Sequence, residues 1–167
     1  MGSFKDIYLN LRSIKLDGHT KNKNGLTYLS WSSAYNIIAS NYDNFSYEVI
    51  SYDGKPYFQD DILGYMVHTK LSIEGISIEE RLPVLDGSNK SLKIEKYSYQ
   101  VKDYKTGNYK TKEVKQCSMM DINTAHKRCF VKNAALFGLG IELYIGEDLQ
   151  HFVFDTELAL NLSLIHI

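Results

Sequence analysis

Residues 121–149 read DINTAHKRCFVKNAALFGLGIELYIGEDL, and this stretch decides the fold of the chain. Its apolar residues recur at helical spacing, which predicts one long amphipathic helix that ends at the Phe-Gly pair 137–138 and is followed by an apolar segment. One face of this helix is expected to pack on a core. The other face is expected to meet an anion, because it carries Lys127, Arg128 and Lys132.

The two faces of the predicted helix can be assigned at about 100° per residue. The arc expected to face the core contains Ile122, His126, Cys129, Phe130, Asn133, Leu136 and Phe137. The opposite arc, expected to face solvent, contains Thr124, Lys127, Arg128, Val131 and Lys132. Adjacent like charges such as Arg128 and Lys132 destabilise a helix slightly unless an anion lies between them. A solvated cationic face is the simpler alternative and stays open.

The residues before this helix predict two shorter helices and an antiparallel sheet. Helical spacing predicts helices over residues 4–14 and 31–41, the second with Ser30 as its N-cap. Residues 17–25 are polar and rich in turn residues, which predicts a loop. This order predicts an α+β fold, with an antiparallel β-sheet packed against the long C-terminal helix. Period-two alternation predicts its strands over residues 45–49, 65–73, 76–84, 94–103 and 109–116.

Charge is distributed unevenly along the 167 residues, although the net charge is only −1. Residues 90–132 hold eleven Lys and Arg against four Asp and Glu, a net charge of +7, so the rest of the chain carries −8. Such a split favours a polyanion bound by one face. A solvated lysine-rich hairpin has the same charge, and charge alone does not separate these two interpretations.

The predicted hairpin at residues 94–116 interleaves tyrosines with lysines. Tyr97 and Tyr99 project to one face of its first strand. Tyrosine rings can stack on bases while ammonium groups bind phosphates, a combination typical of proteins that bind single-stranded nucleic acid. Burial of at least one tyrosine against the long helix is the competing expectation, and Trp31 is expected in the core. The candidate DNA-binding residues are Lys90, Lys93, Lys96, Tyr97, Tyr99, Lys102, Lys127, Arg128 and Lys132.

Composition and motifs exclude several classes of protein. No apolar run reaches the ~20 residues of a membrane span, so no membrane partner is expected. Residues 1–6 lack the apolar core of a signal peptide. Two cysteines suit a reducing cytosol rather than a disulfide framework. The sequence contains no Walker motif, which excludes an ATP-driven recombinase of that type, and no cofactor is predicted.

Three blocks of sequence together carry a family resemblance. They are residues 26–31 (LTYLSW) with Ala34-Tyr35, residues 81–90 (RLPVLDGSNK), and the long helix with its apolar continuation. In this order, over about residues 25–150, the chain resembles phage single-strand annealing proteins of the Sak3 type, which are remotely Rad52-like. Each block alone is weakly specific, and their order and spacing give the resemblance its specificity.

The resemblance implies an ATP-independent protein that coats single-stranded DNA and anneals complementary strands in phage homologous recombination. It further implies a homo-oligomer, as a ring or filament, in the cytoplasm of a bacterial host. A phage exonuclease or the host single-strand-binding protein would be its partner. In Rad52-like proteins a curved antiparallel sheet packs on a long helix whose basic residues line the DNA groove. Those cations lie closer to the Phe-Gly pair than here, so which of Lys127, Arg128 and Lys132 contacts DNA stays open.

Two other functions stay open on the residues themselves. A metal-dependent nuclease needs converging carboxylates, and acidic pairs occur at residues 60–61, 79–80 and 147–148, outside any recognisable motif. A zinc site of His126, Cys129 and Cys117 lacks a fourth ligand at suitable spacing. We therefore assign no catalytic residue and no metal ligand. The second alternative is an adaptor that binds single-stranded DNA without annealing it.

The length of the chain predicts a single domain over residues 1–161. The last six residues, 162–167 (LSLIHI), resemble the translation of a sequencing-adapter end. They are therefore expected to be non-native, with the natural C-terminal region missing.

Overall fold

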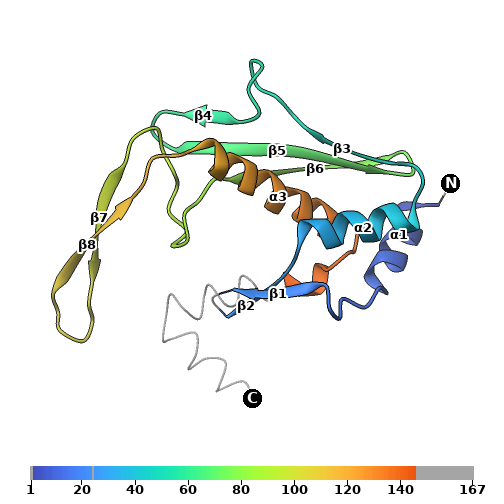
Figure 1. The fold of residues 1–167 in the computed structure, drawn as a ribbon, viewed down its shortest axis with the longest axis horizontal. Helices are drawn as coiled ribbons and strands as arrows, with labels where there is room; N and C mark the ends of the chain where they lie inside the picture. Colours follow the sequence, from blue (N-terminus) through green and yellow to red (C-terminus); the bar gives the residue numbers. More distant parts are fainter. Residues whose placement is uncertain (1, 24, 146–167) are drawn as a thin grey trace.

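An antiparallel sheet lies against a long helix in the body of the protein (Figure 1). The computed structural model describes residues 2–23 and 25–145. The helix is α3 (Met119–Leu136), and it contacts the two long strands β5 (Gly64–Ile73) and β6 (Ile76–Pro83). The α+β class, the antiparallel pairing and the position of the helix after the strands confirm the prediction from sequence.

Helix α3 begins and ends with local signals that the sequence contains. The Asp121 amide donates to the Ser118 hydroxyl at 3.3 Å, and the Ser118 amide donates to the Asp121 carboxylate at 2.8 Å. This capping box satisfies amides that have no partner inside the helix. Phe137 is the C-cap, so the predicted end is confirmed, while the start lies two residues before Asp121.

Strand β5 is the centre of the sheet. It pairs with β6 along one edge, and along the other with β3 (Phe45–Val49) and β4 (Phe58–Asp60). A two-residue turn joins β5 to β6, and both of its residues, Glu74 and Gly75, have positive φ, as tight hairpin turns require. The predicted strands 45–49 and 65–73 match closely, whereas the short strand β4 was not predicted.

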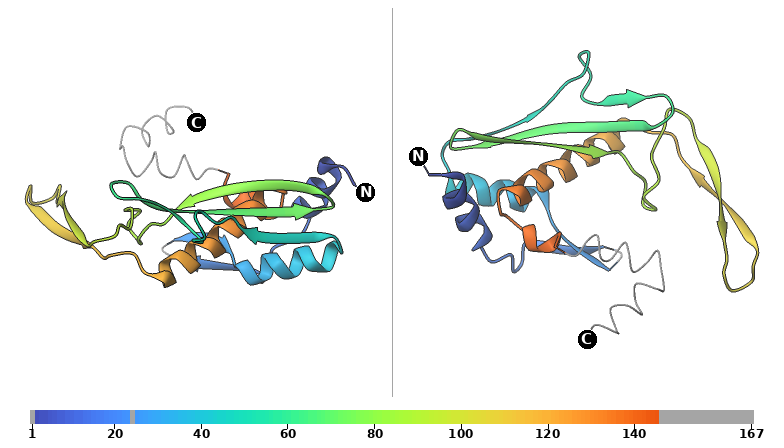
Figure 2. Two further views of the ribbon diagram at one scale, coloured as in Figure 1. Left: turned by 90° about the horizontal axis from the view of Figure 1, so that it is seen from above. Right: turned by 180° about the vertical axis from the view of Figure 1, so that it is seen from behind.

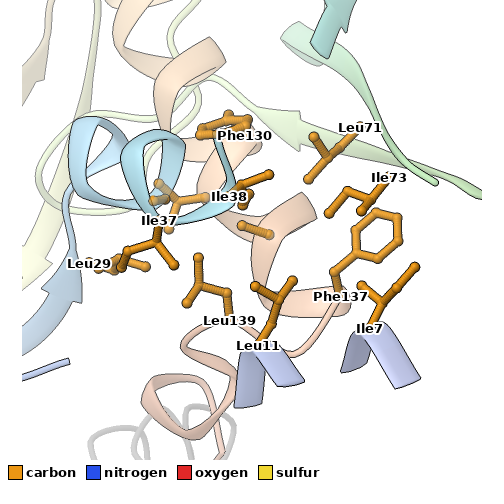
Figure 3. Close-up of a cluster of buried hydrophobic side chains, with 13 residues drawn as sticks. Ile7, Leu11, Leu29, Ile37, Ile38, Leu71, Ile73, Phe130, Phe137 and Leu139 are labelled. Atoms are coloured by element: carbon orange, nitrogen blue, oxygen red, sulfur yellow. The ribbon is translucent and has the colours of Figure 1, made fainter. Parts of the chain in front are cut away.

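Two N-terminal helices close the sheet-and-helix body at one end. They are α1 (Phe4–Arg12) and α2 (Trp31–Asn41), and Ser30 caps α2 as predicted. Figure 3 shows Ile7 and Leu11 of α1 beside Phe137 and Leu139, which follow α3. Because these side chains are almost completely buried, the end of α3 is fixed between α1, α2 and the sheet.

The two helices change which face of α3 is exposed. Val131, predicted on the solvent-facing arc, keeps only 6% of its surface exposed, and Leu136, predicted to face the core, is 39% exposed. Both predictions were wrong because α1 and α2 pack on the C-terminal half of α3, a partner that helical periodicity alone does not reveal. The remaining residues of the predicted apolar arc are buried. The cationic face is therefore limited to the middle of α3, where Arg128 is exposed and Lys127 and Lys132 are half-buried.

Two hairpins extend away from this body (Figures 1 and 2). The first, β1 (Thr20–Lys23) with β2 (Leu26–Leu29), lies where a loop was predicted over residues 17–25. Its first strand is polar and has no apolar alternation, so backbone hydrogen bonds hold the two strands together. The second hairpin, β7 (Tyr97–Lys102) with β8 (Tyr109–Val114), was predicted and is shorter than expected at both ends.

A short 3₁₀ turn, η1 (Ile141–Leu143), follows α3 and contacts β2. The acidic pair at 147–148 and the predicted tail at 162–167 lie outside the described residues. No helix in the described part of the chain combines the length and the apolar character needed to cross a membrane.

Candidate nucleic-acid interface

The register of the β7–β8 hairpin gathers cations that are separated in sequence. Tyr99 pairs with Lys112 and Val101 pairs with Lys110, and directly opposed residues of an antiparallel pair share a face. We call this side the tyrosine face; it carries Tyr97, Tyr99, Val101, Lys110, Lys112 and Val114. Lys102 pairs with Tyr109 on the opposite face, and Lys96 is exposed just before β7. Sequence reasoning missed Lys110 and Lys112, which the turn at residues 103–108 would have revealed through the register.

Lysine ammonium groups lie over both tyrosine rings of this face. The Lys90 Nζ lies 4.7 Å from the centre of the Tyr99 ring, and the Lys93 Nζ lies 4.8 Å from that of Tyr97. Both distances are within the range of a cation–π contact. The Tyr97 hydroxyl also donates to the Ser91 carbonyl at 2.6 Å. The aromatic and cationic groups are thus already held together.

The same tyrosines pack on the core, as the competing expectation required. Tyr97 and Tyr99 are half-buried against a cluster that includes Val114 of β8 and Ile122 of α3. The Cys117 amide donates to the Lys93 carbonyl at 2.8 Å, which ties the strand after β8 to the segment before β7. The base of the hairpin is therefore fixed relative to the start of α3.

An ion pair marks the junction between β8 and α3. The Lys115 Nζ lies 2.5 Å from the Asp121 carboxylate, which also accepts from the Ser118 hydroxyl at 2.8 Å. Burial acts to raise the pKa of Asp121, but the hydrogen bonds from Lys115 and Ser118 outweigh it and hold that pKa below its usual value. Lys115 is thus neutralised locally and contributes little to the excess positive charge.

The three candidate cations of α3 do not share one environment. Arg128 is exposed and Lys132, one turn later, is half-buried. Lys127 points to α2, where its Nζ lies 4.2 Å from the centre of the Trp31 ring. The ion pairs found within residues 2–23 and 25–145 involve none of these three cations. Their charges therefore face solvent or aromatic rings.

Trp31 is not the core residue that the sequence predicted. Its side chain is 45% exposed at the first position of α2, and Tyr35, one turn later, is equally exposed. The buried face of α2 is formed by Ala34, Ile37 and Ile38 instead. Its apolar character and helical spacing predicted that Trp31 is buried. Trp31 instead begins the first turn of α2, ahead of the residues that pack on the core, so its indole lies at the surface.

The residues considered for a metal site have other partners. Cys129 is buried, accepts from the Thr69 hydroxyl at 3.0 Å and donates to the Glu80 carbonyl at 3.3 Å. His126 Nε2 donates to the Pro56 carbonyl at 2.7 Å. Burial lowers the pKa of His126, with a smaller contribution from Lys127 in the same direction. Within the described residues, no three His, Cys, Asp or Glu side chains come together in a way that could hold a metal ion.

The acidic pairs are also engaged in local structure. The Asp60 carboxylate accepts from the backbone amides of Ile62 and Leu63 at 2.9 and 2.8 Å, and these bonds lower its pKa. Glu79 and Glu80 are consecutive on β6, so their side chains point to opposite faces. These two pairs therefore do not converge on one site.

The comparison with protein families gives one match. A family model described as Sak Single Strand Annealing Protein matches residues 5–153. No curated protein and no solved structure matches the chain. The matched range includes every described helix and strand from α2 onward, both hairpins and all the candidate cations.

Proposed function

Since this chain belongs to the Sak single strand annealing protein family, we propose that it binds single-stranded DNA and anneals complementary strands without ATP. The family match over residues 5–153 is the observation that carries this proposal. The fold supports it, because the tyrosine face and the middle of α3, with Lys127, Arg128 and Lys132, place cations and aromatic rings on neighbouring elements. Phage recombination, in the cytoplasm of a bacterial host, is the process that the family suggests.

Annealing by such a surface needs no catalytic group. Cations bind phosphates and release counterions, so the affinity falls as salt rises. Phosphate contacts position a strand without reading its sequence, so sequence preference is small. In this proposal Lys90 and Lys93 leave the rings of Tyr99 and Tyr97 for phosphates, and the uncovered rings stack on bases. The other contacts come from Lys96, Lys102, Lys127, Arg128 and Lys132.

The finer features implied by the resemblance belong to the same proposal. Residues 1–161 would act as one annealing domain of the Sak3 type, with a Rad52-like curved sheet on α3. Identical subunits would assemble as a ring or filament, so that many short sites lie along one strand. A phage exonuclease or the host single-strand-binding protein would deliver or accept the strand.

The test compares binding and annealing by wild type and by Arg128→Ala/Lys132→Ala, without ATP or magnesium. The matched control is Lys5→Ala/Lys55→Ala, which removes two exposed cations from α1 and from the loop after β3. Each lost phosphate contact reduces the slope of log affinity against log salt by roughly 0.7 for single strands. We expect a slope shallower by roughly 1.4 in the α3 variant and an unchanged slope in the control.

The outcomes separate the alternatives. Binding without annealing would favour the adaptor, and loss of labelled strand only in the presence of magnesium would favour a nuclease. Equal slopes in all three proteins would show that Arg128 and Lys132 do not contact DNA phosphates. No binding by the wild-type protein would overturn the proposed function as a whole.

A further inference from the structure

A small aromatic recess opens between α2 and α3. It is lined by Trp31, Tyr35, Tyr47, Lys127 and Phe130, and it has a volume of about 80 Å³. That is well below the roughly 300–1,000 Å³ of sites that enclose a small molecule or cofactor. The recess can therefore receive one flat ring from its open side, rather than a whole ligand.

The floor of the recess is preformed by packed rings. Phe130 is 2% exposed and meets the Tyr47 ring edge-on at 4.8 Å between centres. Tyr35 packs edge-on against Phe45 at 5.3 Å and lies 6.2 Å from Phe130. Aromatic pairs in these geometries are mutually attractive. The site therefore does not have to be assembled when a ligand arrives.

The mouth of the recess is exposed and positively charged. Trp31 and Tyr35 each keep 45% of their surface accessible, and the Lys127 ammonium covers the Trp31 ring at 4.2 Å. The first turn of α2 contains no acidic residue, in contrast to α1 and α3, which carry Asp6 and Asp121 there. An anionic ligand with a flat ring thus meets attraction and no nearby repulsion from this helix.

We propose that this recess binds one unstacked nucleobase of the DNA strand, with Trp31 as its stacking partner and Lys127 on the adjoining phosphate. This inference rests on the proposed function. The free energy gained when a base stacks on an indole is larger than that of an exposed ammonium over the same ring. Replacement of the Lys127 ammonium by a base over the Trp31 ring is therefore favourable. The ammonium then gains a phosphate instead of losing its partner.

The position of the recess makes it continuous with the cationic surface. Lys127 precedes Arg128 on α3, and it lies eight residues, ~12 Å along the helix axis, from the first residue of α3. A strand that follows α3 from the hairpin therefore reaches the recess. Its lining offers apolar ring faces, and the Tyr47 hydroxyl already donates to the His126 carbonyl at 3.4 Å. The recess is thus suited to any base, as annealing requires.

Because Trp31 is the single tryptophan of the chain, its fluorescence reports on this site alone. The experiment titrates wild-type protein with a single-stranded oligonucleotide and with an abasic strand of the same length and charge. We expect strong quenching by the oligonucleotide and little by the abasic strand, even at salt concentrations where both bind. Equal quenching by both, or none by either when anisotropy shows binding, would overturn the inference and leave the proposed function standing.

Variants give an independent measure. We expect Trp31→Ala to weaken single-strand binding roughly tenfold and Trp31→Phe, which keeps a ring, to weaken it less. The matched control is Phe58→Ala, because Phe58 is a similarly exposed ring (47%) on β4, away from α2. If Trp31→Ala binds as tightly as Phe58→Ala, the recess is not a base site. If the wild-type protein binds no oligonucleotide, both this inference and the proposed function are wrong.

Discussion

Gly138, just beyond α3, is the position at which a single methyl group should disturb the packing of the helix end without removing any of its cations. The residue has a φ of +106°, and a Cβ built there meets the backbone of Tyr8 in α1, closest to the carbonyl oxygen. That neighbour is backbone within a helix and cannot rotate away. The perturbation is Gly138→Ala, which strains the local conformation and pushes α1 away from the end of α3.

The magnitude follows from two separate contributions. A side chain held in a glycine-only region of φ and ψ costs about 1–3 kcal/mol. Forcing extra volume into a packed contact costs about 1–3 kcal/mol more. The sum, about 4 kcal/mol, is a large part of the 5–15 kcal/mol typical of a folded domain. At about 2–4 °C per kcal/mol for a chain of this size, the melting temperature should fall by roughly 12 °C.

Thermal unfolding followed by circular dichroism measures this loss. The control is Gly54→Ala, since Gly54 also has a positive φ, +75°, but a Cβ there would meet nothing within 4 Å. It should lose only the conformational contribution, about 1–2 kcal/mol. Below its melting temperature, Gly138→Ala should still bind single-stranded DNA, because the added methyl group meets the backbone of Tyr8 and none of the candidate cations. Equal melting temperatures for the two variants would refute the assigned contact with α1.

Three further outcomes follow from the described contacts. Because the pKa of Asp121 is lowered in the folded state, its pair with Lys115 stabilises the fold above the unfolded pKa of about 3.9, and this stability is lost as the pH falls. Asp121→Asn should therefore lower the melting temperature at neutral pH and make the melting temperature fall less steeply in acid. A thiol reagent should label half-buried Cys117 well before buried Cys129, with the second label appearing only on unfolding; equal rates would contradict the burial. Replacing both Lys110 and Lys112 of the tyrosine face by Ala should make the salt dependence of DNA binding shallower by roughly 1.4, as measured by anisotropy, with Lys5→Ala/Lys55→Ala unchanged.

The sequence predicted the elements whose signals are local. The N-cap at Ser30 and the glycine after Phe137 each act within a few residues, and α2 begins and α3 ends where these signals lie. The capping box at Ser118 is equally local, but the predicted start at Asp121 missed it. The hairpin β7–β8 was likewise visible as alternation on both sides of a turn. In each case the pattern depends only on neighbours in sequence.

Features that depend on distant partners were not predicted. Helical periodicity assigns one environment to each arc, but α3 has different partners along its length, so Val131 is buried and Leu136 is exposed. Strand β1 has no apolar face and is held by pairing with β2, which its own sequence does not encode. Trp31 was expected in the core because it is apolar. Apolarity alone does not show which turns of a helix contact the rest of the protein.

The packing of the hairpin base on the start of α3 explains how the cations of these two elements can act together. A cationic arm on a flexible tether would have to lose conformational freedom when it binds a strand. Here Val114 of β8 and Ile122 of α3 are buried in one cluster with Tyr97 and Tyr99, and the Cys117 amide bonds to Lys93. The hairpin base is therefore oriented by the core before any strand arrives. Rigid placement of the two cationic elements favours a single path for the strand, along the tyrosine face and then along α3.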